Sequence, residues 1–284
     1  MICLDSGSMN YDQLWATTSL RGVASGVLKI HTLKESMHSG VGGGVVPDTF
    51  RVARILLDRI EDSVTGEVKI PEAHCEIPAH VLKANEVMST IDYKGQYAFL
   101  PNVSAEATSS CELALRNCWK PSLTVVGANL PDCKIAGNVI RQETAVKLSL
   151  RTPPIVDANK ACDAMHKILV ANPPYGAHVE FVPDACGSGC ATPELAPWLS
   201  RALEEGSKLA FNKTYGCMGM GGSIPFIGML IQTYPKAQFV VTGVLGPKSN
   251  AHGPDEFLHI PYVKGVTLGV ARVLGDHFVH TPKA

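Results

Sequence analysis

The chain has 284 residues, of which 45% are hydrophobic and 18% are charged, and its formal net charge is -1. This length and apolar content suffice for one large or two medium domains, and we expect two. The near-neutral charge, without any block of Lys or Arg, argues against a nucleic-acid-binding face, because neutralising phosphates requires concentrated positive charge.

Hydropathy and cysteine usage indicate the compartment. No apolar run approaches the roughly 18 to 20 residues that span a bilayer. The first residues, MICLDSGSMNYDQLW, lack the charged and apolar regions of a signal peptide. The nine cysteines are odd in number and scattered, which favours reduced thiols over a disulfide framework. We therefore expect a cytoplasmic protein.

The first half of the chain has the pattern of a split βαβ unit. Residues 17–33 alternate apolar with small or polar residues, which is typical of a strand, and residues 48–62 carry apolar residues at helical spacing. After a weakly patterned segment we expect two strands, a helix and a strand, at 122–128, 145–153, 157–172 and 178–183. This order predicts a ferredoxin-like α+β domain over residues 21–183.

From residue 184 the pattern changes. A helix is expected at 193–211, a glycine cluster at 216–234, a strand at 237–246 and a closing helix after it. One strand and about three helices cannot cover both faces of a sheet. We therefore expect residues 1–20 and 184–284 to form a partial α/β domain whose other strands come from elsewhere.

Polar residues in glycine-rich loops are the candidates for chemistry. Asp5 lies in LDSGSMNYDQLW, His38 in MHSGVGGG, Ser223 in GMGGSIPF and His252 in NAHGPDEF. Taken singly, each has an ordinary explanation as a cap, a turn residue or a solvated side chain. A Gly-Gly-Ser before an apolar helix also presents free backbone N–H groups to an anion.

In combination, the segments LDSGSMNYDQLWATTSLRG, MHSGVGGG, KLSLRTPP, GGSIPF and NAHGPDEFLHIPYVKG resemble one family in order. This family is that of the dinuclear-zinc peptidases, which includes carnosine dipeptidases, bacterial dipeptidases, carboxypeptidases and aminoacylases. The resemblance implies a phosphorylase/hydrolase-like mixed sheet that holds two divalent metal ions, zinc or manganese. It also implies an inserted lid domain that pairs subunits into a homodimer, and a substrate that is a small peptide or an N-acyl amino acid.

The resemblance also implies roles for single residues. Asp5 would bind one metal ion and His252 the other. His38, on the lid, would reach across the dimer and polarise the scissile carbonyl. The free carboxylate of the substrate would be held by Arg151, Gly222 and Ser223.

Other parts of the family's site precede the Asp5 motif, namely further metal ligands and a glutamate base. We therefore expect this chain alone to be inactive. Two alternatives remain open. The chain could be a non-catalytic dimerisation or regulatory module that pairs with full-length paralogues through the lid. It could also be a hydrolase that uses His38 and His252 alone, with one metal ion or by acid–base chemistry.

Overall fold

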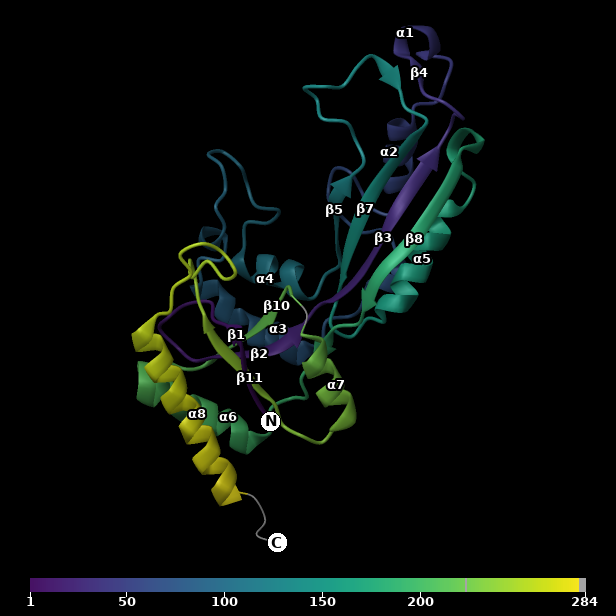
Figure 1. The fold of residues 1–284 in the computed structure, drawn as a ribbon. Coiled ribbons are helices and arrows are strands. Elements are labelled where there is room, and N and C mark those ends of the chain that lie inside the picture. Colours follow the sequence, from purple (N-terminus) through teal and green to yellow (C-terminus); the bar gives the residue numbers. More distant parts are fainter. Residues whose placement is uncertain (223, 281–284) are drawn as a thin grey trace. The chain divides into compact units, whose positions relative to one another are not determined.

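The computed structural model describes residues 1–222 and 224–280. The chain forms two compact units, whose elements are labelled in Figure 1. Unit 1 consists of Met1–Leu20, Glu76–Trp119 and Cys190–Ala284, and unit 2 consists of Arg21–Cys75 and Lys120–Gly189. No helix among the described residues is both long and apolar enough to cross a membrane.

Unit 2 is built on a four-stranded antiparallel sheet. Its strands are β3 (Gly22–His31), β5 (Ser122–Ala128), β7 (Glu143–Thr152) and β8 (His178–Gly187), in the order β5-β7-β3-β8. Helix α2 (Thr49–Leu57) follows β3, and α5 (Ala158–Val170) joins β7 to β8. This is the ferredoxin-like βαββαβ order, so the predicted fold class is confirmed for unit 2.

The sheet of unit 2 buries one face against both helices. Leu28 and Ile30 of β3 are fully buried, and so are Leu148 and Leu150 of β7. Lys147, which directly precedes Leu148, points to the other, exposed face, because successive strand residues alternate. The alternating sequence pattern therefore predicts correctly which strand side chains form the core of this unit. Helix α2 is shorter than the predicted 48–62, because the chain turns away after its C-cap at Asp58.

A two-stranded ribbon, β4 (Met37–His38) with β6 (Val139–Ile140), and the single-turn helix α1 (Ser39–Gly42) extend one end of unit 2. Short 3-10 turns occur in both units, at Pro71–Ala73, Glu86–Thr90, Lys94–Gln96 and Pro174–Gly176.

Unit 1 contains parallel and antiparallel strand pairs, as expected for a mixed sheet. Strand β1 (Ile2–Gly7) pairs in parallel with β11 (Val240–Leu245). Strand β2 (Trp15–Leu20) pairs in parallel with β10 (Gly216–Met220) and antiparallel with β9 (Cys190–Ala191). The predicted strand 17–33 is thus two strands, β2 and β3, which separate at Arg21, where the chain enters unit 2.

Three helices complete the C-terminal part of unit 1. They are α6 (Pro197–Phe211), α7 (Pro225–Thr233) and α8 (Ile260–His280). Helices α6 and α8 lie side by side (Figure 1), and their close approach needs Gly206, where a Cβ would stand 3.0 Å from the Cα of Gly269. Helix α8 continues through His277 and His280, and the His280 ring Nδ1 lies 2.8 Å from Asp276 O.

The weakly patterned segment belongs to unit 1, whereas we expected it inside the insertion 21–183. It contains α3 (Ala79–Asn85) and α4 (Ser110–Cys118). Its apolar side chains, including Met88 and Ala114, pack on Trp15 and Met218 of the unit 1 strands. This packing groups the segment with unit 1, although both ends of the segment continue into unit 2.

Candidate metal and substrate site

Asp5 lies where the pairing of β1 with β11 is irregular. Cys3 is opposite Val241 and Ser6 is opposite Gly243, and the register shifts between these two pairs. Such an irregularity turns side chains away from the regular pleat. Asp5 is exposed, and no described residue forms a hydrogen bond or an ion pair with its carboxylate. The carboxylate is therefore available to a ligand.

The residue after Asp5 connects three strands. The Ser6 hydroxyl is buried and lies 2.5 Å from Thr17 Oγ1 of β2 and 2.9 Å from Met220 Sδ of β10. Strand β10 leads directly into Gly222. The contacts of Ser6 therefore hold β1, which contains Asp5, close to the end of β10, which Gly222 follows.

His252 lies in the loop that follows β11. Its backbone φ is 60°, and Lys248, Asn250 and Asp255 in the same loop also have positive φ values. This left-handed conformation is costly for residues other than glycine, and it tends to occur at functional sites. The His252 backbone N–H donates to Glu256 Oε2 at 3.2 Å. The imidazole is exposed and has no partner among the described residues.

Tyr11 fixes the base of this loop. Its hydroxyl donates to Pro247 O at 3.1 Å, and its ring stacks on His259 with the centroids 4.3 Å apart. A Cβ at Gly246 would overlap the Tyr11 ring, so the glycine is required there. Burial raises the pKa of Tyr11, which keeps the phenol protonated as a donor. Tyr11 is a structural part of the site to which the motifs assign no role, although it lies within LDSGSMNYDQLW.

Gly222 is exposed between β10 and α7, and its Cβ position faces open space. Ser223 lies outside the described residues. The N-cap of α7, Ile224, makes no side-chain hydrogen bond to the helix, so the first N–H groups of α7 are not capped by that side chain. The start of α7 therefore offers free backbone N–H groups and the positive end of the helix dipole, and both favour binding of an anionic group.

In unit 2, His38 is the N-cap of α1, and its Nδ1 accepts a hydrogen bond from the Gly40 N–H at 3.0 Å. In a neutral imidazole this leaves the proton on Nε2, because one ring nitrogen accepts and the other donates. The side chain is exposed. His38 therefore presents an N–H donor, which is the group needed to polarise a carbonyl oxygen.

Arg151 lies in β7, opposite Val23 of β3 and Ser122 of β5. It is half-buried, and no described residue pairs with its guanidinium. The eight steps along β3 from Val23 to His31 cover about 26 Å, and His38 lies beyond His31. Within one copy of unit 2, Arg151 and His38 are therefore at opposite ends of the sheet.

The donor set for a metal ion is partial. Asp5 and His252 offer a carboxylate and an imidazole, both of which bind zinc. The part of the chain that the structure describes has no group of three or more His, Cys, Asp or Glu side chains that could hold a metal ion. A catalytic zinc takes three protein ligands, so these two residues fit the ion but do not complete its site.

Comparison with known proteins supports the resemblance drawn from the motifs. No family model matches the chain. The chain is 26% identical over 275 residues to the cysteinylglycine-S-conjugate dipeptidase of Corynebacterium striatum, an alignment that covers 95% of this chain and 58% of that protein.

Solved structures show the same fold. The dipeptidase Dug1p from Saccharomyces cerevisiae matches with a TM-score of 0.75 at 20% identity, over 99% of this chain and 59% of Dug1p. An M20 family metallo-carboxypeptidase from Sulfolobus solfataricus matches with a TM-score of 0.75 at 16% identity, over 96% of this chain and 62% of the other. The chain thus spans about three fifths of the length of these relatives.

Proposed function

We propose that this chain forms part of a metal-dependent, dipeptidase-like hydrolase that cleaves peptide or amide bonds of small substrates with a free carboxylate. The observation that carries the proposal is the Tyr11 contact, which ties the His252 loop to the segment that carries Asp5. Two unpartnered metal-donor side chains are thereby presented from adjoining segments of unit 1. The similarity to a dipeptidase over 95% of the chain supports the same function.

In this proposal, Asp5 and His252 would each hold one divalent ion, zinc or manganese, together with ligands from outside the described residues. Bound ions of this kind supply Lewis acidity and an activated water. The chain's own residues would bind and orient the substrate. The Nε2–H of His38 would polarise the scissile carbonyl, and the guanidinium of Arg151 would hold the substrate carboxylate, with Gly222, Ser223 and the start of α7 as further donors.

The positions of His38 and Arg151 support a homodimer. One copy of unit 2 holds them at opposite ends of its sheet, so a single copy cannot bring both to one small substrate. We therefore propose that His38 acts on a substrate held by the second subunit, and that pairing occurs through unit 2. All nine cysteines are free thiols, which fits the proposed cytosolic location.

Hydrolysis of dipeptides tests the proposal. Because the metal donors of the described residues are partial and we expect this chain alone to be inactive, the chain is assayed together with a segment that supplies the remaining metal ligands. The substrates are cysteinylglycine and N-acetyl amino acids, with added zinc or manganese and again with a chelator. We expect chelation to abolish hydrolysis and His38→Ala to lower kcat about 100-fold or more, whereas His178→Ala, an exposed histidine of the same unit, leaves it unchanged. Hydrolysis that survives both chelation and His38→Ala would refute the proposed chemistry.

One observation favours a second candidate, a regulatory module that pairs with full-length paralogues. The described residues contain no metal-binding cluster of three ligands, so this chain could contribute its dimerising unit without a complete site. Size-exclusion chromatography with a full-length paralogue separates the two candidates. A stable mixed dimer in which this chain stays inactive even when the remaining metal ligands are supplied favours the module, and failure to form any mixed dimer excludes it.

A further inference from the structure

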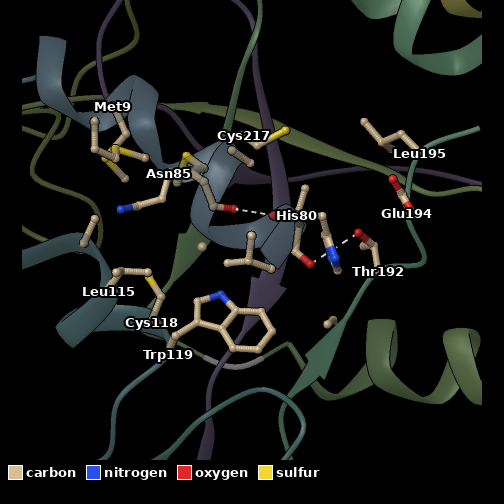
Figure 2. A pocket seen from close by; sticks show the side chains of 18 of the residues that line it. Met9, His80, Asn85, Leu115, Cys118, Trp119, Thr192, Glu194, Leu195 and Cys217 are labelled. Carbon is tan, nitrogen blue, oxygen red and sulfur yellow. Dashed lines mark hydrogen bonds between the residues drawn. The ribbon is translucent and has the colours of Figure 1, made fainter. Parts of the chain in front are cut away.

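Unit 1 contains a cavity of about 220 Å³ that the proposed function does not use (Figure 2). Its walls come from β2, β10, α3, α4 and the segment 191–195. Asp5, Gly222 and His252 are not among the described residues that line it. The volume lies just below the roughly 300 to 1,000 Å³ of drug-sized sites, so the cavity suits a fragment-sized molecule.

The cavity lies where the chain leaves and re-enters unit 1. Thr18 stands two residues before the end of the first segment of the unit, Trp119 closes the second, and Thr192 stands near the start of the third. Two of these segments are joined at the cavity, because the N–H and hydroxyl of Thr192 donate to Thr18 O at 2.9 and 3.2 Å. A molecule bound here would contact three of the connecting segments together.

The apolar part of the lining is buried and includes an aromatic ring. Met88, Ala114 and Met218 are almost fully buried, and Trp119 is 5% exposed. Figure 2 shows the Trp119 indole on one side of the cavity, with Thr192, Glu194 and Leu195 on another. Thioether and indole surfaces favour a flat apolar body.

The lining carries one carboxylate, that of Glu194, and one imidazole, that of His80. Glu194 is exposed at the cavity, and no described residue pairs with its carboxylate. The lining residues include no Lys or Arg. Burial raises the pKa of the Cys217 thiol to about 11, so this lining residue is neutral at physiological pH. A ligand carboxylate would find no fixed cation here, whereas an ammonium group would find Glu194.

We propose that this cavity is a binding site, separate from Asp5 and His252, for a small amine with an apolar, phenyl-sized body, and that the bound amine orders the segments that connect unit 1 to unit 2. The Ser200 and Tyr215 hydroxyls, 3.0 Å apart, also line the cavity and offer hydrogen bonds to such a ligand. Binding at this cavity does not require hydrolytic activity.

Three probes that share one body test the charge preference. The protein is titrated with 2-phenylethylamine, 2-phenylethanol and 3-phenylpropionate, and binding is followed by the indole N–H signal of Trp119 in 1H–15N spectra, assigned with Trp119→Phe. We expect the amine to bind most tightly and the carboxylate most weakly. If the carboxylate binds as tightly as the amine, or no probe shifts the Trp119 signal up to its solubility limit, the proposal fails.

Two variants distinguish the contribution of the Glu194 charge to ligand binding from that of the cavity shape. Glu194→Gln is expected to weaken amine binding about fivefold, the size of an exposed ion pair, and to leave alcohol binding unchanged. Ala84→Leu, which fills the cavity from α3, is expected to weaken both, whereas Lys83→Leu on the same helix, outside the lining, weakens neither. Because Glu194 is exposed, its substitution tests the proposal even if Ala84→Leu fails to fold.

Hydrogen exchange tests the ordering of the connecting segments. With saturating 2-phenylethylamine, amide exchange is expected to slow several-fold in residues 17–20, 117–119 and 190–193, with little change in α8. Binding without protection of these segments would refute the ordering and leave only a passive cavity.

Discussion

Tyr11 stacks on His259, with ring centroids 4.3 Å apart and ring planes 14° apart. The stack closes one end of the loop that carries His252, and the Tyr11 hydroxyl holds the other end at Pro247 O. One aromatic residue, six positions after Asp5, therefore fixes the loop. The position of His252 depends on Tyr11 more than on contacts of its own side chain.

Removal of the Tyr11 ring should loosen the His252 loop. Tyr11→Ala deletes a hydrogen bond and a ring stack, each worth about 1 kcal/mol. We expect a loss of about 2 kcal/mol in the free energy of unfolding of unit 1 and faster amide exchange in residues 247–257. Tyr11→Phe should lose only about half of this stability. Tyr234→Ala, at an exposed tyrosine, is the control, and equal effects at both tyrosines would contradict the assignment.

The Ser6–Thr17 contact should be a stabilising element of unit 1. Both hydroxyls are buried, so loss of one leaves the other without its better partner. Thr17→Val keeps the shape and removes the hydroxyl, and we expect a cost of about 1 to 2 kcal/mol in denaturant unfolding. Thr17→Ser keeps the hydroxyl and should lose less. If Val is tolerated better than Ser, the hydrogen bond does not stabilise this unit.

A core substitution in unit 2 should affect that unit alone. Leu148→Ala leaves a cavity between the sheet and its helices and should cost about 2 to 5 kcal/mol. The three tryptophans, Trp15, Trp119 and Trp198, all lie in unit 1. We therefore expect the circular-dichroism transition of unit 2 to shift while the tryptophan fluorescence transition stays in place. Equal shifts would show that the units unfold as one.

Stability should fall with rising pH through the titration of half-buried thiols. Burial raises the pKa of Cys217 from 9.0 to about 11, so above pH 9 the unfolded chain loses this proton first. The contribution is complete below pH 9 and is lost as pH rises to about 11. Cys217→Ala should make the decline over this window less steep. Part of the slope should remain, because burial also raises the pKa of Cys190 to about 11. An unchanged slope would contradict the raised pKa of Cys217.

The sequence predicted unit 2 better than unit 1. Alternating apolar residues such as Leu148 and Leu150 predict a strand with one buried face from neighbouring residues alone. The βαββαβ order then follows from such local patterns. Strand β10 was missed, because Gly216 and Gly219 are poor strand formers and are held there by close packing on Trp15 and Ser19. The segment 76–119 was misplaced, because its packing on Trp15 is a tertiary contact without a local signal.

The candidate site also combines features that local motifs predict with features that depend on contacts between distant residues. The motifs name Asp5, His38 and His252 as candidates, and the structure shows all three side chains exposed. Their roles in metal and substrate binding stay predictions. Tyr11 could not be recognised, because its role depends on Pro247 and His259, more than 200 residues away in the chain. The separation of Arg151 from His38 likewise appears only once the register of β3 with β7 is known.

Paramagnetic broadening by Mn²⁺ tests the central claim, that Asp5 and His252 present metal-donor groups, and it detects binding even when affinity is weak. We expect substoichiometric Mn²⁺ to broaden amide signals of residues 4–7 and 250–254 first. His252→Ala should remove the effect at the loop and Asp5→Asn the effect in β1, with His277→Ala as an unaffected control. Broadening confined to other acidic surfaces, or unchanged in His252→Ala and Asp5→Asn, would contradict the claim.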